Sequence, residues 1–508
     1  MTNSQRIIVN TIAQYTRTII NVCLSLYSTR LILGALGQSD YGIYSLVAGV
    51  IAMLSFITNA LVVTTQRFLS VYHGKNDKQK IRSIFSNSML LHIMIAGIIG
   101  GMLFALGSWI TQDFLNISLE RQQAAWWVYN AAVIMLILTF ITAPIRALFI
   151  ARENIVYISI VDVIDGILKL LIAIGLSHFA YDHLISYAGL MACIALFNLL
   201  AFGVYAACKF PEFHFPRLGE WNKHYIKELS QFAGWTTYST GCVVARNQGI
   251  AVVLNLFYGT IVNSAYGIAQ HVIGAVQFIS VSILNAMNPQ IMKAEGANDR
   301  QRMLRLCEYE SKYACLLLSM LTIPLIAEMD TILRIWLGDV PEHATMFCRF
   351  ILAAALCDQI SVGLTSANQA VGKIRTFSLV FYTFKLTVVV LAWLCLRNGL
   401  PLVSIMWCYV GVELFTSFLR LPLMKYIADI PMLPFCRNVF MRILVPLMSM
   451  SAVCYLTTTH LDMTWRIVPT FIISGIVGFL SIWITSLTDI EKQYIQQIFT
   501  RKSKQQHE

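Results

Sequence analysis

Long apolar segments recur along this chain, and they limit its possible folds more than any other feature. Runs of about 20 residues, the length that crosses about 30 Å of hydrocarbon as an α-helix, are separated by short polar breaks. Of the 508 residues, 57% are hydrophobic and only 12% are charged, whereas about 25% are charged in a typical soluble domain. The sequence therefore predicts an integral membrane protein.

Apolar runs bounded by glycine, proline and charged clusters predict an all-α, polytopic membrane protein with about fourteen transmembrane helices. Each run is long enough to cross a bilayer once. The predicted ranges are 8–33, 42–64, 85–108, 123–147, 155–177, 184–208, 228–257, 265–289, 311–335, 346–371, 376–396, 401–424, 438–458 and 465–487.

Basic residues are distributed unevenly between the predicted loops, and loops rich in Lys and Arg stay cytoplasmic. Most of the 37 basic residues fall in the N-terminal segment, the even-numbered loops and the C-terminal tail, whereas only Arg121, Arg397 and Arg466 fall in odd-numbered loops. Both termini are therefore predicted to be cytoplasmic. This topology accounts for the net charge of +11, so no nucleic-acid partner is expected.

Two short segments are repeated at a long offset. Residues 41–43 match residues 266–268, and residues 74–80 (GKNDKQK) match residues 296–302 (GANDRQR), at offsets of 225 and 222. Both basic segments are predicted to be cytoplasmic, so the repeat is parallel. We expect two parallel six-helix lobes, 1–210 and 211–427, followed by two extra helices and a cytoplasmic tail, 428–508. Rocking of such lobes gives alternating access.

Three segments carry a resemblance to a known family. The segment 30–44 (RLILGALGQSDYGIY) is followed by 65–68 (TQRF), and 332–338 (ILRIWLG) comes later. Together with the fourteen helices, these segments resemble the Wzx-type oligosaccharide flippases of the multidrug/oligosaccharidyl-lipid/polysaccharide exporter superfamily. The resemblance implies a bacterial inner membrane protein that flips an undecaprenyl-diphosphate-linked oligosaccharide to the periplasmic leaflet for surface polysaccharide assembly, possible partners being a polymerase and chain-length machinery.

A diphosphate-linked sugar needs polar groups and fixed positive charges along its path. Four polar residues share one face of the first predicted helix, and Arg17, near its middle, is a cavity candidate because a charge there is expensive in lipid. Arg246 holds the corresponding place in the other lobe, and Arg67 is a candidate for substrate entry or for snorkelling into the headgroups. The predicted cavity residues are Asn10, Gln14, Arg17, Asn21, Arg67, Lys169, Arg246 and Lys385. The alternative for Arg17 is a salt bridge between helices. If Arg17 and Arg246 are uncompensated charges, their replacement by alanine is expected to abolish transport without unfolding the protein.

Four intramembrane acids are candidates for ion coupling. Asp165 and Lys169 are four residues apart on one helix and can neutralise each other, which leaves Asp162 over. Asp358 and Glu413 are isolated acids that could bind an ion or could pair with Arg246 or Lys385. A proton, sodium or the membrane potential could each drive the cycle, so no cofactor is expected.

Two other functions compete with this interpretation. A MATE-like antiporter of cations or drugs would need a cavity lined by acids and aromatic residues, whereas basic residues are at least as prominent inside these helices. A membrane enzyme would need a large outer loop or a catalytic cluster, so no enzyme activity is expected. The ten histidines are not clustered at ligand spacing, so no metal site is expected.

Overall fold

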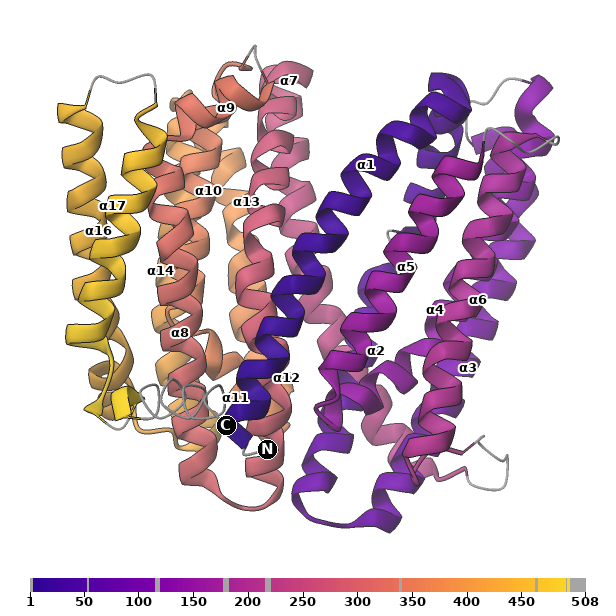
Figure 1. Cartoon of the computed structure of the whole chain (residues 1–508), viewed down its shortest axis with the longest axis horizontal. Coiled ribbons are helices and arrows are strands. Elements are labelled where there is room, and N and C mark those ends of the chain that lie inside the picture. Colours follow the sequence, from indigo (N-terminus) through magenta and orange to yellow (C-terminus); the bar gives the residue numbers. More distant parts are fainter. Residues whose placement is uncertain are drawn as a thin grey trace, which may run out of the picture. The chain divides into compact units, whose positions relative to one another are not determined.

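The structure, a computed structural model, describes residues 3–52, 54–114, 119–176, 182–214, 221–337, 340–461, 465–489 and 491–493. These residues form helices and no β-strand (Figure 1). Nine described helices are long and apolar enough to cross a membrane, or ten if α10 (Ala344–Gln359) and α11 (Val362–Val371), bent by 47°, are one broken span. The polytopic all-α class is confirmed, and the count of fourteen stays a prediction.

The chain forms two compact units. Unit 1 contains Met1–Gly241, Asn285–Met303 and Gln369–Ser378, and unit 2 contains Cys242–Leu284, Leu304–Asn368 and Leu379–Glu508. Most of each predicted lobe falls in one unit, but the segments 211–241, 285–303 and 369–378 of the second lobe belong to the unit formed by the first lobe. The boundaries predicted at 210 and 427 stay predictions.

The helices of the first predicted lobe follow the apolar runs closely, except around residue 40. There α1 continues past its predicted end through a break at Gly37, whose φ of 75° suits glycine, and α2 begins later and ends later than the predicted 42–64. In Figure 1, α1 and α5 lie side by side, and they pack closely. The helices are α1 (Asn3–Ala52), α2 (Ser55–Gly74), α3 (Lys78–Trp109), α4 (Gln122–Ala151), α5 (Ile155–Gly175) and α6 (His183–Lys209).

The later helices are more often interrupted. α7 has 74 residues, which would be about 110 Å long if straight, so it cannot be one crossing. It holds both predicted helices 228–257 and 265–289, and its part from Ala265 to Gly296 is long and apolar enough to span by itself. The remaining helices are α7 (Lys223–Gly296), α8 (Arg300–Ala327), α9 (Met329–Leu337), α12 (Ile374–Phe377), α13 (Thr383–Arg397), α14 (Val403–Ala428), α15 (Met432–Phe435), α16 (Met441–His460) and α17 (Ile467–Ser481).

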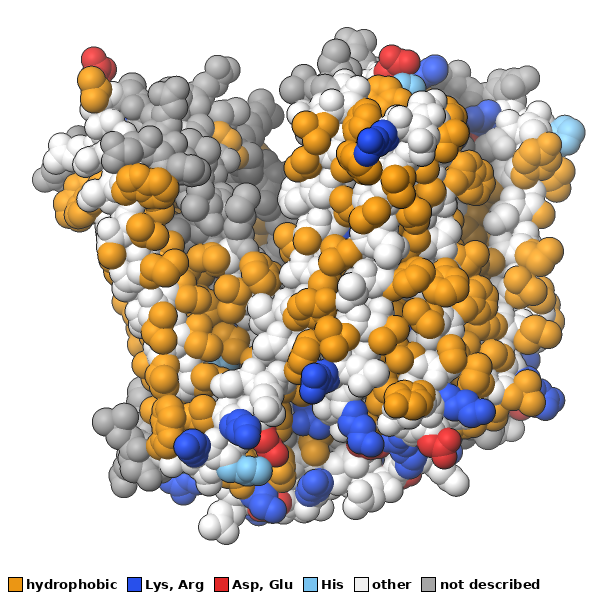
Figure 2. Space-filling model, turned by 180° about the vertical axis from the view of Figure 1, so that it is seen from behind, with side chains coloured by type: hydrophobic (Ala, Val, Ile, Leu, Met, Phe, Trp, Pro, Cys, Tyr) orange, Lys and Arg blue, Asp and Glu red, His pale blue; other side chains and the backbone are white. Residues whose placement is uncertain are grey.

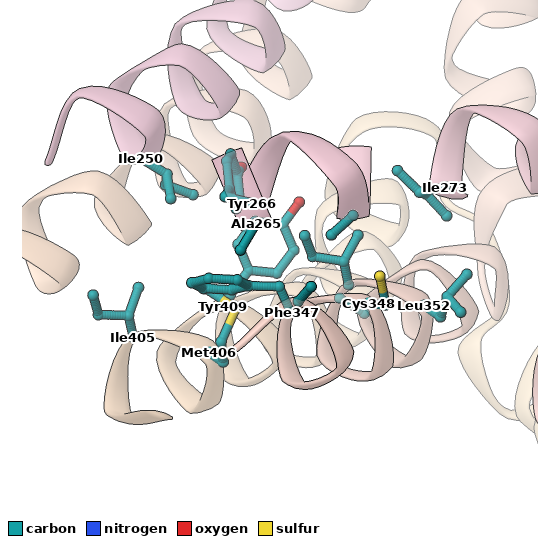
Figure 3. Packing of buried hydrophobic residues seen from close by; sticks show 14 of the residues in the cluster. Ile250, Ala265, Tyr266, Ile273, Phe347, Cys348, Leu352, Ile405, Met406 and Tyr409 are labelled. Carbon is teal, nitrogen blue, oxygen red and sulfur yellow. The ribbon is translucent and has the colours of Figure 1, made fainter. Parts of the chain in front are cut away.

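Apolar side chains fill the space between the helices and also cover their outer faces. Figure 2 shows hydrophobic side chains along the helices, with Lys and Arg gathered at one end. The core of unit 2 joins α7, α10 and α14, where Tyr266, Phe347 and Tyr409 are buried together (Figure 3). The rings of Tyr266 and Phe347 meet edge to face, with centroids 5.8 Å apart. An apolar exterior above a basic end is what a multi-pass membrane protein requires.

The two repeated turns have the same backbone conformation. Asn76 and Asn298 adopt left-handed φ angles of 54° and 57°. In each turn the following aspartate caps the next helix: Asp77 Oδ1 accepts from the Lys80 amide and Asp299 Oδ1 accepts from the Arg302 amide, both at 3.1 Å. The repeat found in the sequence is therefore also a repeat in structure.

Candidate functional site

In unit 1 the predicted Arg17 forms part of a three-residue charge cluster. Its Nη1 donates to Asp162 Oδ2 at 2.6 Å. Arg146 of α4 donates to the same carboxylate through both terminal nitrogens, at 2.9 and 3.0 Å. Asp162, which the sequence left without a partner, is therefore shared by two arginines from two other helices. The cluster carries two positive charges and one negative charge.

These three side chains line a cavity of about 550 Å³. The remaining lining is mostly polar and comes from α1, including the predicted Asn21. Arg17 and Asp162 are about one-fifth exposed and Arg146 about one-third exposed, so the cluster is accessible from this cavity. The lining residues are Arg17, Thr18, Asn21, Val22, Ser25, Arg146 and Asp162.

Other residues predicted for this cavity lie elsewhere in unit 1. The Asn10 amide donates to the backbone oxygen of Glu153 at 3.0 Å, which ties α1 to the turn between α4 and α5. Gln14 is buried and does not line the cavity. Lys169 and Asp165 pair within α5 at 2.7 Å, as expected from their spacing, and Asp165 also accepts from Asn198 at 2.7 Å.

Unit 2 contains a larger and more deeply buried cluster, which joins α7, α10, α13 and α14. Arg246 pairs with Glu413. Lys385 bridges Glu413, at 2.8 Å, and Asp358, at 2.7 Å. Asp358 also accepts from Arg420 at 2.8 Å. The predicted candidates Arg246, Lys385, Asp358 and Glu413 are thus brought together, with three cations and two carboxylates in one network.

Aromatic rings cover the cations of this network. The Arg246 guanidinium lies 5.0 Å from the ring centre of Tyr409, a residue of the core shown in Figure 3. Lys385 and Arg420 lie 5.0 and 4.5 Å from the ring centre of Phe381. Each contact is a cation–π interaction, which is stronger away from water. The expectation that Arg17 and Arg246 are uncompensated charges is wrong, because both are paired with carboxylates.

Arg67 binds the end of a helix instead of lining a cavity. Its Nε donates to the carbonyl of Gln369 at 2.9 Å and its Nη2 approaches the carbonyl of Ala370 at 3.4 Å, both at the end of α11. The next turn contains Gly372, with φ 84°, where a side chain would overlap the guanidinium. A cation is well placed there because the last carbonyls of a helix lack partners. The entry role predicted for Arg67 stays a prediction.

A second contact involves the two repeated turns. A Cβ atom on Gly74 would overlap the carbonyl oxygen of Lys293, and a Cβ on Gly296 would overlap that of Val71. The two glycines are thus related by the repeat, and each allows the other turn to approach. Nearby, Glu153 accepts from Lys293 and from Gln290. We call Gly74, Gly296, Glu153 and Lys293 the basic-end contact.

Sequence reasoning missed Arg146 and Arg420. Both lie inside predicted helices, 123–147 and 401–424, and an arginine within a membrane segment is a candidate site by default. Glu310 of α8 is a third omission, since the predicted helix began one residue after it.

Comparison with known proteins shows to which family this chain belongs. The profile of a family described as polysaccharide biosynthesis protein matches residues 4–295, more than half of the chain. No curated protein sequence matches.

Solved structures resemble the chain at the level of the fold. A MOP superfamily transporter from Pyrococcus furiosus, described as having a binding pocket of reverse polarity, superposes with a TM-score of 0.72 at 12% identity, over 84% of this chain and 96% of that one. An outward-facing multidrug resistance MATE transporter gives 0.73 at 12% identity and a MATE in the bent conformation gives 0.75 at 11%, with the same coverages. The predicted superfamily fold is confirmed.

Proposed function

Because this chain belongs to the polysaccharide biosynthesis protein family and has the fold of MOP superfamily transporters, we propose that it flips an undecaprenyl-diphosphate-linked oligosaccharide from the cytoplasmic to the periplasmic leaflet. The chain is a multi-pass membrane protein with a transporter fold. The substrate and the direction are the proposal. No enzymatic step is needed, because flipping changes no covalent bond.

The observation that carries the proposal is the cavity around Asp162. Two arginines share one carboxylate there, so one positive charge is in excess among the charged residues that line it. Guanidinium groups bind phosphate oxygens in pairs of parallel hydrogen bonds. The hydroxyl and amide groups of Thr18, Asn21 and Ser25 suit carbohydrate. A diphosphate could take over the hydrogen bonds that the arginines now give to Asp162.

The charge network in unit 2 also favours an anionic substrate over a cationic one. Its three cations outnumber its two carboxylates, so it too has one positive charge in excess among the described residues. A transporter of organic cations would need an acid that is free to bind its substrate. Here all four predicted coupling acids, Asp162, Asp165, Asp358 and Glu413, already pair with Lys or Arg. The MATE-like alternative is therefore disfavoured.

We further propose that the basic-end contact opens and closes during transport. Its location at the Lys- and Arg-rich end would put it on the cytoplasmic side, with both termini there. Contacts made through two glycine backbones and one ion pair, Glu153–Lys293, are small enough to separate and to form again. Alternating access of this kind would expose the cavity to each leaflet in turn. The bacterial inner membrane and cooperation with a polymerase and chain-length machinery belong to the same proposal.

The proposed function can be tested by measuring the polyprenyl-linked lipids of the source cells. Polyprenyl-linked lipids are extracted from cells with and without the gene and are analysed by mass spectrometry. The proposal predicts that a diphosphate-linked oligosaccharide accumulates in the deletion strain and that a surface glycan is lost. Restoring the wild-type gene must reverse both changes, and restoring Arg146→Ala must not. An unchanged lipid pool in the deletion strain would contradict the proposed substrate.

A further inference from the structure

One buried acid of unit 2 differs from all the others. Glu310, on α8, is completely buried. Neither carboxyl oxygen accepts a hydrogen bond or pairs with a cation in the described part of the chain, and the Ser366 hydroxyl of α11 is its polar neighbour. The four acids expected to couple transport to an ion are all paired with cations, and Glu310 is the acid that is not.

The two helices α8 and α11 pack closely beside Glu310. The backbone amide of Gly363 donates to the Ser311 hydroxyl at 2.9 Å, so α11 lies directly against α8. A Cβ atom on Gly363 would overlap the carbonyl oxygen of Cys307. Ser311, Cys307 and Ser366 are themselves almost completely buried. The carboxyl group is therefore shielded from solvent on a helix, α8, that packs directly against α11.

The charged groups closest in sequence point away from this enclosure. Glu308 and Lys312 are each two residues from Glu310, which puts them about 200° around the helix. Glu308 accepts from Asn438 at 3.0 Å, and Lys312 donates to Glu491 at 2.6 Å. α11 contains no charged residue. At the end of α10, Asp358 is held by Lys385 and Arg420.

A carboxylate shielded in this way would lose its hydration and gain no opposite charge. We propose that Glu310 is a proton-binding site and that its carboxyl group must be protonated for α8 and α11 to pack together as they do here. In the reaction a proton from water adds to one carboxylate oxygen, and the resulting hydroxyl can donate to Ser366. Loss of that proton creates a buried charge that only separation of the two helices can hydrate.

The position of α11 connects this site to the rest of the chain. At its start, the Ser361 hydroxyl, in the bend between α10 and α11, lies 3.2 Å from Arg420 Nη1 of the unit 2 network. At its end, the carbonyls of Gln369 and Ala370 bind Arg67. Proton release from Glu310 would thus loosen a helix that contacts the charge network at one end and Arg67 at the other. This coupling acts through helix packing, whichever substrate the protein carries.

Infrared spectroscopy of the purified full-length protein tests the protonation state directly. At neutral pH, the wild type should show the carbonyl stretch of a protonated carboxyl group, and Glu310→Gln should lack it. Glu308→Gln, two residues away and hydrogen-bonded to Asn438, is the matched control and should retain the band. If Glu310→Gln does not fold, Glu310→Met replaces it. A wild-type spectrum without a band that depends on Glu310 would overturn the proposal.

Hydrogen exchange tests the effect on packing. As the pH rises, amide protection of 362–371, corrected for the intrinsic exchange rate, should fall in the wild type and in Glu308→Gln. It should stay high in Glu310→Gln, because glutamine resembles the protonated acid and cannot ionise. A merely structural glutamate predicts the same profile in all three proteins, and that result would refute the coupling. Neither measurement depends on the transported lipid. Both results can therefore be interpreted even if the protein does not carry the proposed substrate.

Discussion

At the scale of residues, most of the charged side chains discussed above form clusters in which cations and carboxylates pair. Sequence reasoning found Arg17, Arg246, Lys385 and the acids around them because an ionisable residue is expensive in a membrane segment. It offered Arg246 or Lys385 as partners of Asp358 and Glu413, and the structure shows such pairs. It could not assign a partner to Arg17, because Asp162 is 145 residues away. The pairing within α5 was predictable because it depends only on helical spacing.

The two arginines of the cavity should each be needed for transport. Each charge-assisted hydrogen bond contributes about 1.5–3 kcal/mol, so Arg17→Ala and Arg146→Ala should each weaken binding of the diphosphate lipid about tenfold or more. Arg146→Lys should restore only part of the loss, since lysine cannot bind in the same bidentate manner. Binding is measured with the purified lipid in nanodiscs. Lys169→Ala, whose partner is on its own helix, is the control. Equal affinity for all variants would exclude this cavity as the phosphate site.

The charge network of unit 2 should matter for stability. Glu413→Gln leaves Arg246 and Lys385 with too little negative charge in a buried site, and breaking such a pair costs about 3–5 kcal/mol. The unfolding temperature in detergent should fall markedly. Lys80→Ala breaks a pair at the start of α3 whose lysine side chain is 51% exposed, so it should lower the unfolding temperature only slightly. A Glu413→Gln protein as stable as the wild type would show that the network contributes little.

At the scale of elements, apolar runs predicted most helices to within a few residues, because a membrane span has a required length and composition. The bend between α10 and α11 and the short π-helical segments, such as Ser378–Tyr382, have no such signature. They depend on packing against other helices. The repeated turns were visible in sequence, but their mutual contact at Gly74 and Gly296 was not.

Alanine at either glycine should open the basic-end contact. Gly74→Ala and Gly296→Ala each place a methyl group where a backbone oxygen now lies, and neither backbone can move aside without separating the turns. Hydrogen exchange of residues 71–77 and 293–299 should become faster in both variants. Gly234→Ala is the control, because a Cβ there meets no atom within 4 Å. Unchanged exchange in the two variants would mean that the turns do not hold each other in solution.

At the scale of the whole molecule, the sequence alone was enough to predict a polytopic membrane protein, because its hydrophobic composition and positive-inside pattern are global properties. The transporter role was implied by the family resemblance. The superfamily fold is confirmed by structural likeness at 12% identity over 84% of the chain. Structural similarity at such low sequence identity does not identify the substrate. The substrate has to be argued from Arg17, Arg146 and Asp162, which no global pattern identifies.

Flipping by the purified protein tests the central claim most directly. The protein is reconstituted into liposomes with an undecaprenyl-diphosphate-linked oligosaccharide, and the sugar exposed on the outer leaflet is measured with a glycosidase that cannot enter. We predict that the wild type makes lipid from the inner leaflet accessible and that Arg17→Ala and Arg146→Ala liposomes resemble empty ones. The account would be contradicted if the glycosidase reached no more sugar in wild-type liposomes than in protein-free liposomes, when the lipid carries the native glycan.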